Sequence, residues 1–207
     1  VSPAAADAPE PRFPLEVAFC PSCSLVQILE DVPPQQLFVD NYLYFSSFSD
    51  HLLQHARAHA LDLIERRHLD GESLVVELAS NDGYLLRNFV EVGIPVLGID
   101  PAPEQAATAE AAGVPTLREF FGATLARRLR DDGRRADVIL ANNVMAHTPA
   151  LNSFVDGLAI LLADDGIATI ENTYDEVDFT SFTSSSYREF GQGLGDATIT
   201  LTVFQDF

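Results

Sequence analysis

The stretch SLVVELASNDGYLL, residues 73–86, decides the fold of this chain. Its first half, SLVVELA (73–79), is an apolar run without polar alternation, which is typical of a central parallel strand buried on both faces. A polar turn, SNDG (80–83), follows it, and the pattern from Tyr84 to Val92 then favours a helix. A strand, a tight turn and a helix in this order predict the opening of a βαβ unit.

The same alternation continues along the chain to residue 172. Further buried strands are predicted at IPVLGID (94–100), VPTL (114–117), DVILAN (137–142) and GIATIEN (166–172). Helices are predicted over 49–68, 103–112, 122–131 and 149–162. We therefore expect an α/β domain of the doubly wound, Rossmann-like class, with a mostly parallel sheet and helices on both faces.

The two ends of the chain depart from this alternation. Residues 15–30 indicate a small β-rich piece with a C-x-x-C turn at Cys20 and Cys23, and ATITLTVFQD (197–206) alternates apolar residues with Thr as a half-buried strand does. The predicted divisions are an N-terminal appendage (1–48), the α/β domain (49–175) and a C-terminal tail (176–207).

Charge and composition exclude several classes of protein. Twelve basic against 31 acidic residues leave a net charge of -19, which argues against binding to nucleic acid or to an anionic membrane. Hydrophobic residues at 47% and charged residues at 21% are ordinary globular values. No apolar run approaches the roughly 20 residues that span a bilayer, and residues 1–11 lack a signal-peptide pattern, so we expect a cytoplasmic protein.

The loop after the first predicted strand is the leading candidate for a nucleoside site. In an open α/β sheet, ligands bind beyond the carboxyl ends of the strands, where backbone N–H groups at a tight turn can approach them. The usual loop of methyl-donor proteins is E-x-G-x-G-x-G, and the corresponding residues here are Glu77, Ala79, Asn81 and Gly83. One of the three glycines is kept, and the G-x-G-x-x-G spacing of NAD proteins is absent.

Two other strand ends carry polar side chains. Asp100, at the tip of the next strand, can accept hydrogen bonds from both ribose hydroxyls, or it simply caps the chain before Pro101. Asn142 and Asn143 close a later strand and can hydrogen-bond a cofactor or substrate, although Asn is also a common loop residue.

Taken together, these segments resemble the S-adenosylmethionine-dependent C-methyltransferases that act on nucleotide-linked deoxysugars. The resemblance extends from about residue 13 to residue 172 and is carried, in the order of the family, by FPLEVAFCPSCSLVQ, LFVDNYLYFSSFSDHLLQHA, VVELASNDGYLL, GIDPA and ANNVMAHTPAL. The variant loop SNDGYLL is itself typical of that family and accounts for the missing glycines.

This resemblance implies that residues 49–175 bind S-adenosylmethionine and that a nucleotide sugar is the substrate. It implies cofactor contacts from Ala79, Asn81, Gly83, Asp100, Pro101 and Asn142, and a covering loop of Tyr42, Tyr44, Ser46 and Ser47. The implied reaction removes a proton next to a keto group, after which the enolate carbon attacks the donor methyl. The candidate catalytic residues are Tyr44, His147, Tyr174 and Glu176.

The chain also departs from the family. The family has an N-terminal zinc module with two cysteine pairs, and tetrahedral zinc wants four ligands, but only Cys20 and Cys23 are present. They are either half of a zinc site, which His51, His55 or His59 could complete, or plain buried thiols. The family's catalytic histidine segment and its second domain are missing after residue 172, so the enzyme is expected to be catalytically incomplete or a fragment.

Residues 176–207 are instead similar to a segment of phage tail tube proteins. This leaves two other readings of the whole chain: a non-catalytic assembly module that uses its C-terminal strand to pair with a partner, or a methyltransferase for another small metabolite. The terminal strand is also expected to pair with the edge of the sheet, where methyltransferases of this class carry an antiparallel strand.

Overall fold

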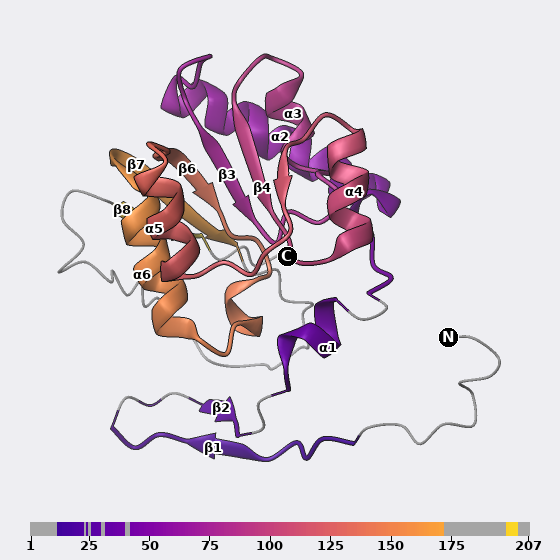
Figure 1. The fold of residues 1–207 in the computed structure, drawn as a ribbon, viewed down its shortest axis with the longest axis vertical. Coiled ribbons are helices and arrows are strands. Elements are labelled where there is room, and N and C mark those ends of the chain that lie inside the picture. The colour runs from indigo at the N-terminus through magenta and orange to yellow at the C-terminus, as the bar shows by residue number, and fades with distance from the viewer. Residues whose placement is uncertain are drawn as a thin grey trace, which may run out of the picture. The chain divides into compact units, whose positions relative to one another are not determined.

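The computed structural model describes residues 12–22, 24, 26–29, 32–39, 42–171 and 198–202, with the backbone alone for residue 171 and for 198–202. The chain divides into two compact units, Val1–Tyr44 and Phe45–Phe207 (Figure 1). None of the described helices is long and apolar enough to cross a membrane.

The first unit contains a short antiparallel hairpin and one helical turn. Strand β1 (Val17–Phe19) pairs with β2 (Val26–Ile28), and α1 (Pro34–Phe38) follows. Cys20 lies in the turn that joins the strands, where its carbonyl accepts a 2.8 Å hydrogen bond from the N–H of Ser24. The predicted β-rich piece is thus confirmed, while Cys23 lies outside the described residues.

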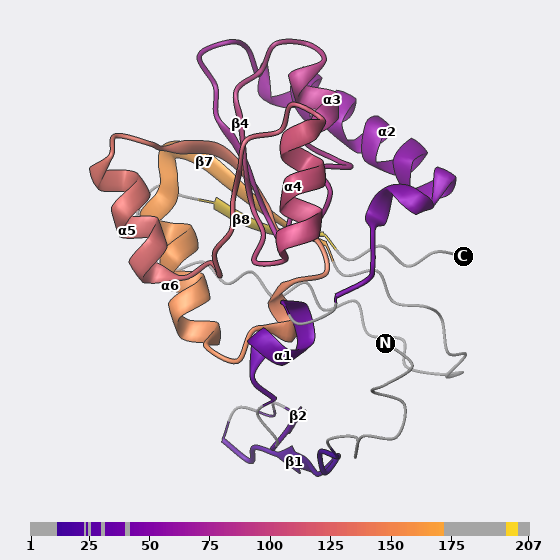
Figure 2. The same ribbon diagram turned by 45° about the vertical axis from the view of Figure 1, so that its right-hand side comes forward.

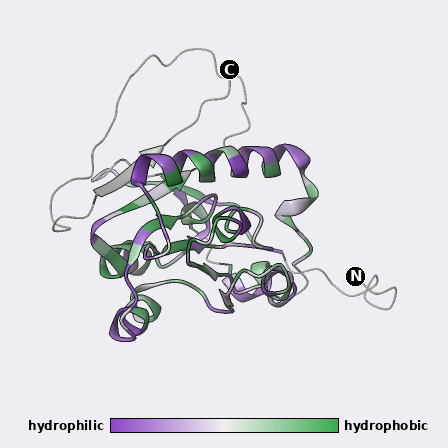
Figure 3. Cartoon of the chain, turned by 90° about the horizontal axis from the view of Figure 1, so that it is seen from above, coloured by the Kyte–Doolittle hydropathy of each residue, from purple (hydrophilic) through white to green (hydrophobic). Residues whose placement is uncertain are grey.

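The second unit opens with a short 3-10 turn, η2 (Ser46–Phe48), and the long helix α2 (Asp50–Arg67). Ser49 caps this helix because its hydroxyl accepts a hydrogen bond from the Leu52 N–H at 3.2 Å. Hydrophilic and hydrophobic residues alternate along α2 (Figure 3), and its apolar side buries Ala56, Ala60 and Leu63.

A sheet of six strands forms the centre of the second unit, in the order β5-β4-β3-β6-β7-β8. Its strands are β3 (Val75–Leu78), β4 (Val96–Ile99), β5 (Thr116–Leu117), β6 (Ala136–Leu140), β7 (Leu162–Glu171) and β8 (Thr198–Thr202). Every neighbouring pair is parallel. The chain moves outward from β3 through β4 and β5 and then returns to β6, so the strand order reverses beside β3.

Helices cover both faces of this sheet (Figures 1 and 2). One hydrophobic core joins Val75 of β3 to residues of α2, α3 (Arg87–Val90) and α4 (Pro103–Ala111). A second core joins Val76 and Leu78 of the same strand to α5 (Ala123–Asp131) and α6 (Leu151–Leu161). Successive β3 side chains therefore enter opposite cores, which explains why this strand has no polar alternation. The predicted doubly wound α/β fold is confirmed.

Two elements differ from the sequence-based expectation. The helix predicted from Tyr84 to Val92 is regular only over Arg87–Val90, because the Asn88 amide donates to the carbonyls of Tyr84 and Leu85, at 3.3 and 2.9 Å, and competes with the helical pattern. The terminal strand β8 pairs with β7 in parallel and not antiparallel. The long segment between them gives the chain the length that a parallel return requires.

Candidate functional site

The loop after β3 has the backbone of a glycine loop without most of the glycines. Ala79, Asn81 and Gly83 have φ values of 55°, 49° and 75°, all in the left-handed region. These are the three positions at which E-x-G-x-G-x-G has glycine. A left-handed residue other than glycine costs about 1–2 kcal/mol, and Asn tolerates it best. The loop conformation is therefore kept at a cost in strain, which indicates that the surrounding contacts fix it.

Those contacts come first from the neighbouring strand. The Asn81 N–H donates to Asp100 Oδ2 at 2.8 Å, and the Ala102 N–H donates to Asp100 Oδ1 at 2.8 Å. Asp100 therefore does cap the chain around Pro101. It also holds the loop after β3, through Asn81. Its side chain is buried, which raises the pKa of Asp100 against the opposing effect of the two backbone hydrogen bonds. Each carboxylate oxygen keeps a further lone pair for a ligand hydroxyl.

A second set of contacts comes from η2. The Ser46 N–H donates to Asn81 Oδ1 at 2.9 Å, and the Ser47 N–H donates to Asp82 Oδ2 at 3.1 Å, with the Ser47 hydroxyl bound to the same oxygen. The resemblance implies a covering loop that includes Ser46 and Ser47, and these two residues do contact the loop after β3. Tyr42 and Tyr44 belong to the other unit, where their ring centroids are 6.5 Å apart.

Glu77 is a buried acid at the base of the loop. Its side chain is 1% exposed, and its Oε2 has no hydrogen-bond partner among the described residues. Desolvation, followed by the nearby charges of Asp100 and Asp82, raises the pKa of Glu77 well above its ordinary value of 4.5. The neutral acid is favoured because a buried negative charge beside two other carboxylates is costly.

This raised pKa predicts that stability depends on pH through Glu77. The folded state retains the proton where the unfolded chain loses it, so the native state loses stability as pH rises above 4.5 towards the folded pKa. Glu77→Gln removes this dependence. We expect the free energy of unfolding of the wild type, measured in urea, to fall relative to that of the variant as the pH rises from 5 to 8. A difference that stays constant over this range would contradict the assignment.

A pocket opens next to the loop, at the carboxyl end of β6. It is a shallow hollow with about 340 Å³ of empty space, open solvent included. Its lining residues are Leu52, His55, Ala56, His59, Tyr84, Leu85, Asn142 and Asn143. The side-chain oxygen Asn142 Oδ1 is buried and has no hydrogen-bond partner among the described residues. Asn143 adopts a left-handed φ of 51°, which turns the chain at the strand end. Both predicted asparagines therefore line this pocket.

The sequence did not predict that two histidines of α2, His55 and His59, line this pocket. Their i, i+4 spacing was visible in the sequence, and it places the rings of His55 and His59 in a stack with centroids 6.4 Å apart. The sequence also suggests these histidines as possible metal ligands together with the cysteines. Among the described residues, no group of three or more His, Cys, Asp and Glu side chains could hold a metal ion.

The remaining candidate residues lie apart from this pocket or outside the description. His147 is an exposed residue of η3 (Met145–His147) and does not line the pocket. Tyr174 and Glu176 lie outside the described residues. Cys20 lies in the hairpin turn, and the zinc-ligand role predicted for it and for Cys23 stays a prediction.

Two family descriptions and one curated relative match parts of this chain. Residues 76–168 match a family described as "Methyltransferase domain", and residues 1–38 match "Putative zinc binding domain". The chain is 33% identical over 165 residues to the C-methyltransferase NovU of Streptomyces niveus, a match that covers 80% of this chain and 39% of that protein. The chain thus spans well under half the length of this relative.

Two solved structures align with part of this chain. A mycobacterial quinone oxidoreductase aligns with a TM-score of 0.51 and 16% identity, over 80% of this chain and 48% of that one. The magnesium protoporphyrin IX methyltransferase of Synechocystis, solved with bound SAH, aligns with a TM-score of 0.44 and 18% identity, over 62% of this chain and 60% of that one.

The parallel sheet with helices on both faces has the Rossmann-like α/β fold. Within that fold, residues 76–168 match the family described as a methyltransferase domain.

Proposed function

We propose that this chain binds S-adenosylmethionine and forms part of an enzyme that methylates a carbon atom of a nucleotide-linked keto-deoxysugar. The observation that carries the cofactor proposal is the hydrogen bond between the Asn81 N–H and Asp100 Oδ2, which joins the β3 loop to the tip of β4 at the point where strand order reverses. A loop in a glycine-like conformation beside a carboxylate suits the ribose of a nucleoside.

The residues present fit such a ligand. Unused hydrogen-bonding capacity surrounds the loop, since Asp82 Oδ1, Ser80 Oγ and Asn142 Oδ1 are buried without partners among the described residues. When bound, S-adenosylmethionine would supply an electrophilic methyl group. Asp100 would bind the ribose hydroxyls, and Asn142 would contact the part of the ligand beyond the ribose. Ser46 and Ser47 would keep the loop in place during binding, because they hold Asn81 and Asp82.

The sugar substrate is supported by sequence and not by the pocket. The relative at 33% identity is named as a C-methyltransferase, and the family resemblance points to nucleotide-linked deoxysugars. The candidate catalytic residues Tyr44, His147, Tyr174 and Glu176 stay predictions. A cytoplasmic setting and zinc binding at Cys20 and Cys23 belong to the same proposal, the latter supported by the family that matches residues 1–38.

Isothermal titration calorimetry with S-adenosylhomocysteine tests the cofactor proposal directly. We expect saturable heat below millimolar ligand. NAD⁺ is the matched control ligand, because Rossmann-like folds also bind dinucleotides but this chain lacks the NAD loop spacing. Saturable binding of NAD⁺ with no response to S-adenosylhomocysteine would overturn the proposal.

A further inference from the structure

We propose that the pocket between α2 and the end of β6 binds the zwitterionic amino-acid end of the nucleoside ligand, with His55 and His59 on its carboxylate and Asn142 on its ammonium group. This inference rests on the proposed function. It assigns a role to two histidines that neither the family matches nor the sequence analysis had connected with the cofactor.

The position of the pocket follows from the strand order. Asp100 ends β4 on one side of β3, and Asn142 follows β6 on the other side. The main chain passes from the nucleoside loop directly into the pocket wall, because Tyr84 and Leu85 come immediately after Gly83. A ligand whose ribose lies at Asp100 and which extends across the end of β3 therefore reaches the pocket with its other end.

The side chains that line the pocket indicate which part of the ligand it binds. Of the described residues that line the pocket, the two imidazoles are the groups able to become cationic, and none is acidic. They and the Asn143 amide offer hydrogen-bond donors for a carboxylate. Asn142 Oδ1 offers the opposite, a buried acceptor without a partner among the described residues. An α-amino acid group has a carboxylate, which needs hydrogen-bond donors, next to an ammonium group, which needs an acceptor. The lining of this pocket provides both.

The net charge of the ligand end also fits. A chain with a formal charge of -19 disfavours a multiply charged anion such as a diphosphate in a pocket with no arginine in its lining. A zwitterion carries no net charge and meets no such penalty. Leu52, Ala56 and Leu85 supply an apolar wall for the methylene carbons between the thioether and the amino-acid group.

A pair of ligands separates this subsite from the nucleoside loop. S-adenosylhomocysteine carries the amino-acid end, and 5′-methylthioadenosine has the same nucleoside and thioether without it. By calorimetry on the full chain, we expect the wild type to bind S-adenosylhomocysteine about 10- to 100-fold more tightly, the range for one or two charge-assisted hydrogen bonds.

The double variant His55→Ala/His59→Ala is expected to lose most of this ratio while its affinity for 5′-methylthioadenosine stays unchanged. Asn142→Ala tests the ammonium contact from another element and is expected to lower the ratio with α2 intact. His51→Ala is the control, because His51 lies on the same helix but does not line the pocket. Circular dichroism verifies the fold of each variant.

The possible outcomes are distinct. Equal affinities of the two ligands for the wild type, or a ratio that survives in both the double variant and Asn142→Ala, would overturn the subsite and leave the proposed function standing. Absence of binding by both ligands would remove the proposed function, and the subsite with it.

Discussion

Replacing Gly83 with alanine is expected to lower the free energy of unfolding by about 2–5 kcal/mol. Gly83 has a φ of 75°, so any side chain there is strained by about 1–2 kcal/mol. A Cβ at this position would also lie 3.0 Å from Val114 Cγ2 and 3.2 Å from Ala109 Cβ, inside a packed core. Overpacking of this kind adds about 1–3 kcal/mol. Urea denaturation followed by circular dichroism measures the change.

Gly93→Ala provides a matched control for this prediction. Gly93 has a similar φ of 82°, but a Cβ there would meet nothing within 4 Å. This variant is expected to lose only the strain of about 1–2 kcal/mol. If the two variants were equally destabilised, the close packing of the loop against Val114 would have no energetic consequence. The loop would then be held by its hydrogen bonds alone.

Replacing Asp100 with asparagine is expected to weaken the binding of S-adenosylhomocysteine by about 100-fold. The substitution removes the negative charge that we place at the ribose hydroxyls, and hydrogen bonds to a charged group contribute about 1.5–3 kcal/mol each. It also leaves the N–H of Asn81 or of Ala102 without its acceptor, since an amide offers one oxygen in place of two. Calorimetric titration of the variant measures the loss.

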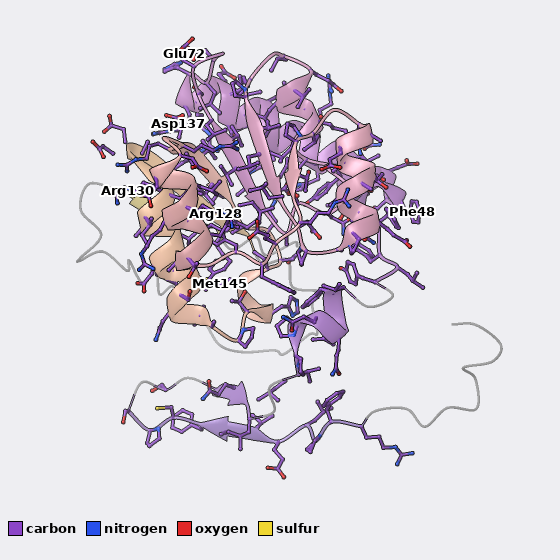
Figure 4. The ribbon with its side chains drawn as sticks, viewed as in Figure 1. Phe48, Glu72, Arg128, Arg130, Asp137 and Met145 are labelled. Atoms are coloured by element: carbon purple, nitrogen blue, oxygen red, sulfur yellow. The ribbon has the colours of Figure 1, made fainter. Side chains whose placement is uncertain are left out.

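Asp137→Asn is the control for a general effect of removing a carboxylate that holds the backbone. Asp137 Oδ2 accepts the Leu74 N–H at 2.7 Å, at the end of the sheet where β3 and β6 begin. Figure 4 shows Asp137 at that end and Met145 at the opposite end, beyond β6. We expect Asp137→Asn to bind S-adenosylhomocysteine like the wild type. Equal weakening by both substitutions would mean that Asp100 acts only through stability.

Much of the fold was predictable because the apolar stretches of the sequence are the segments that the structure buries in its two cores. Leu74, Val75, Val76 and Leu78 are apolar, and the structure buries Val75 in one core and Val76 and Leu78 in the other. The pairing of Asp100 with the β3 loop was also accessible, since parallel strands bring their carboxyl ends to one edge. The prediction of a helix was wrong for the residues just after Gly83, and hydrophobic periodicity cannot reveal the reason. The Asn88 side chain takes the carbonyls of Tyr84 and Leu85.

The sequence by itself determined the alternation of strands and helices, the turn after β3 and the acidic tip of β4, because each depends on residues that are close together along the chain. Only the tertiary structure showed that Ala79 and Asn81 adopt the left-handed conformation typical of glycine. It also showed that Ser46 and Ser47 hold the loop, and that His55, His59 and Asn142 line the same pocket. These facts depend on contacts between elements far apart in sequence, where packing and hydrogen bonding, and not local preference, decide the position of each group.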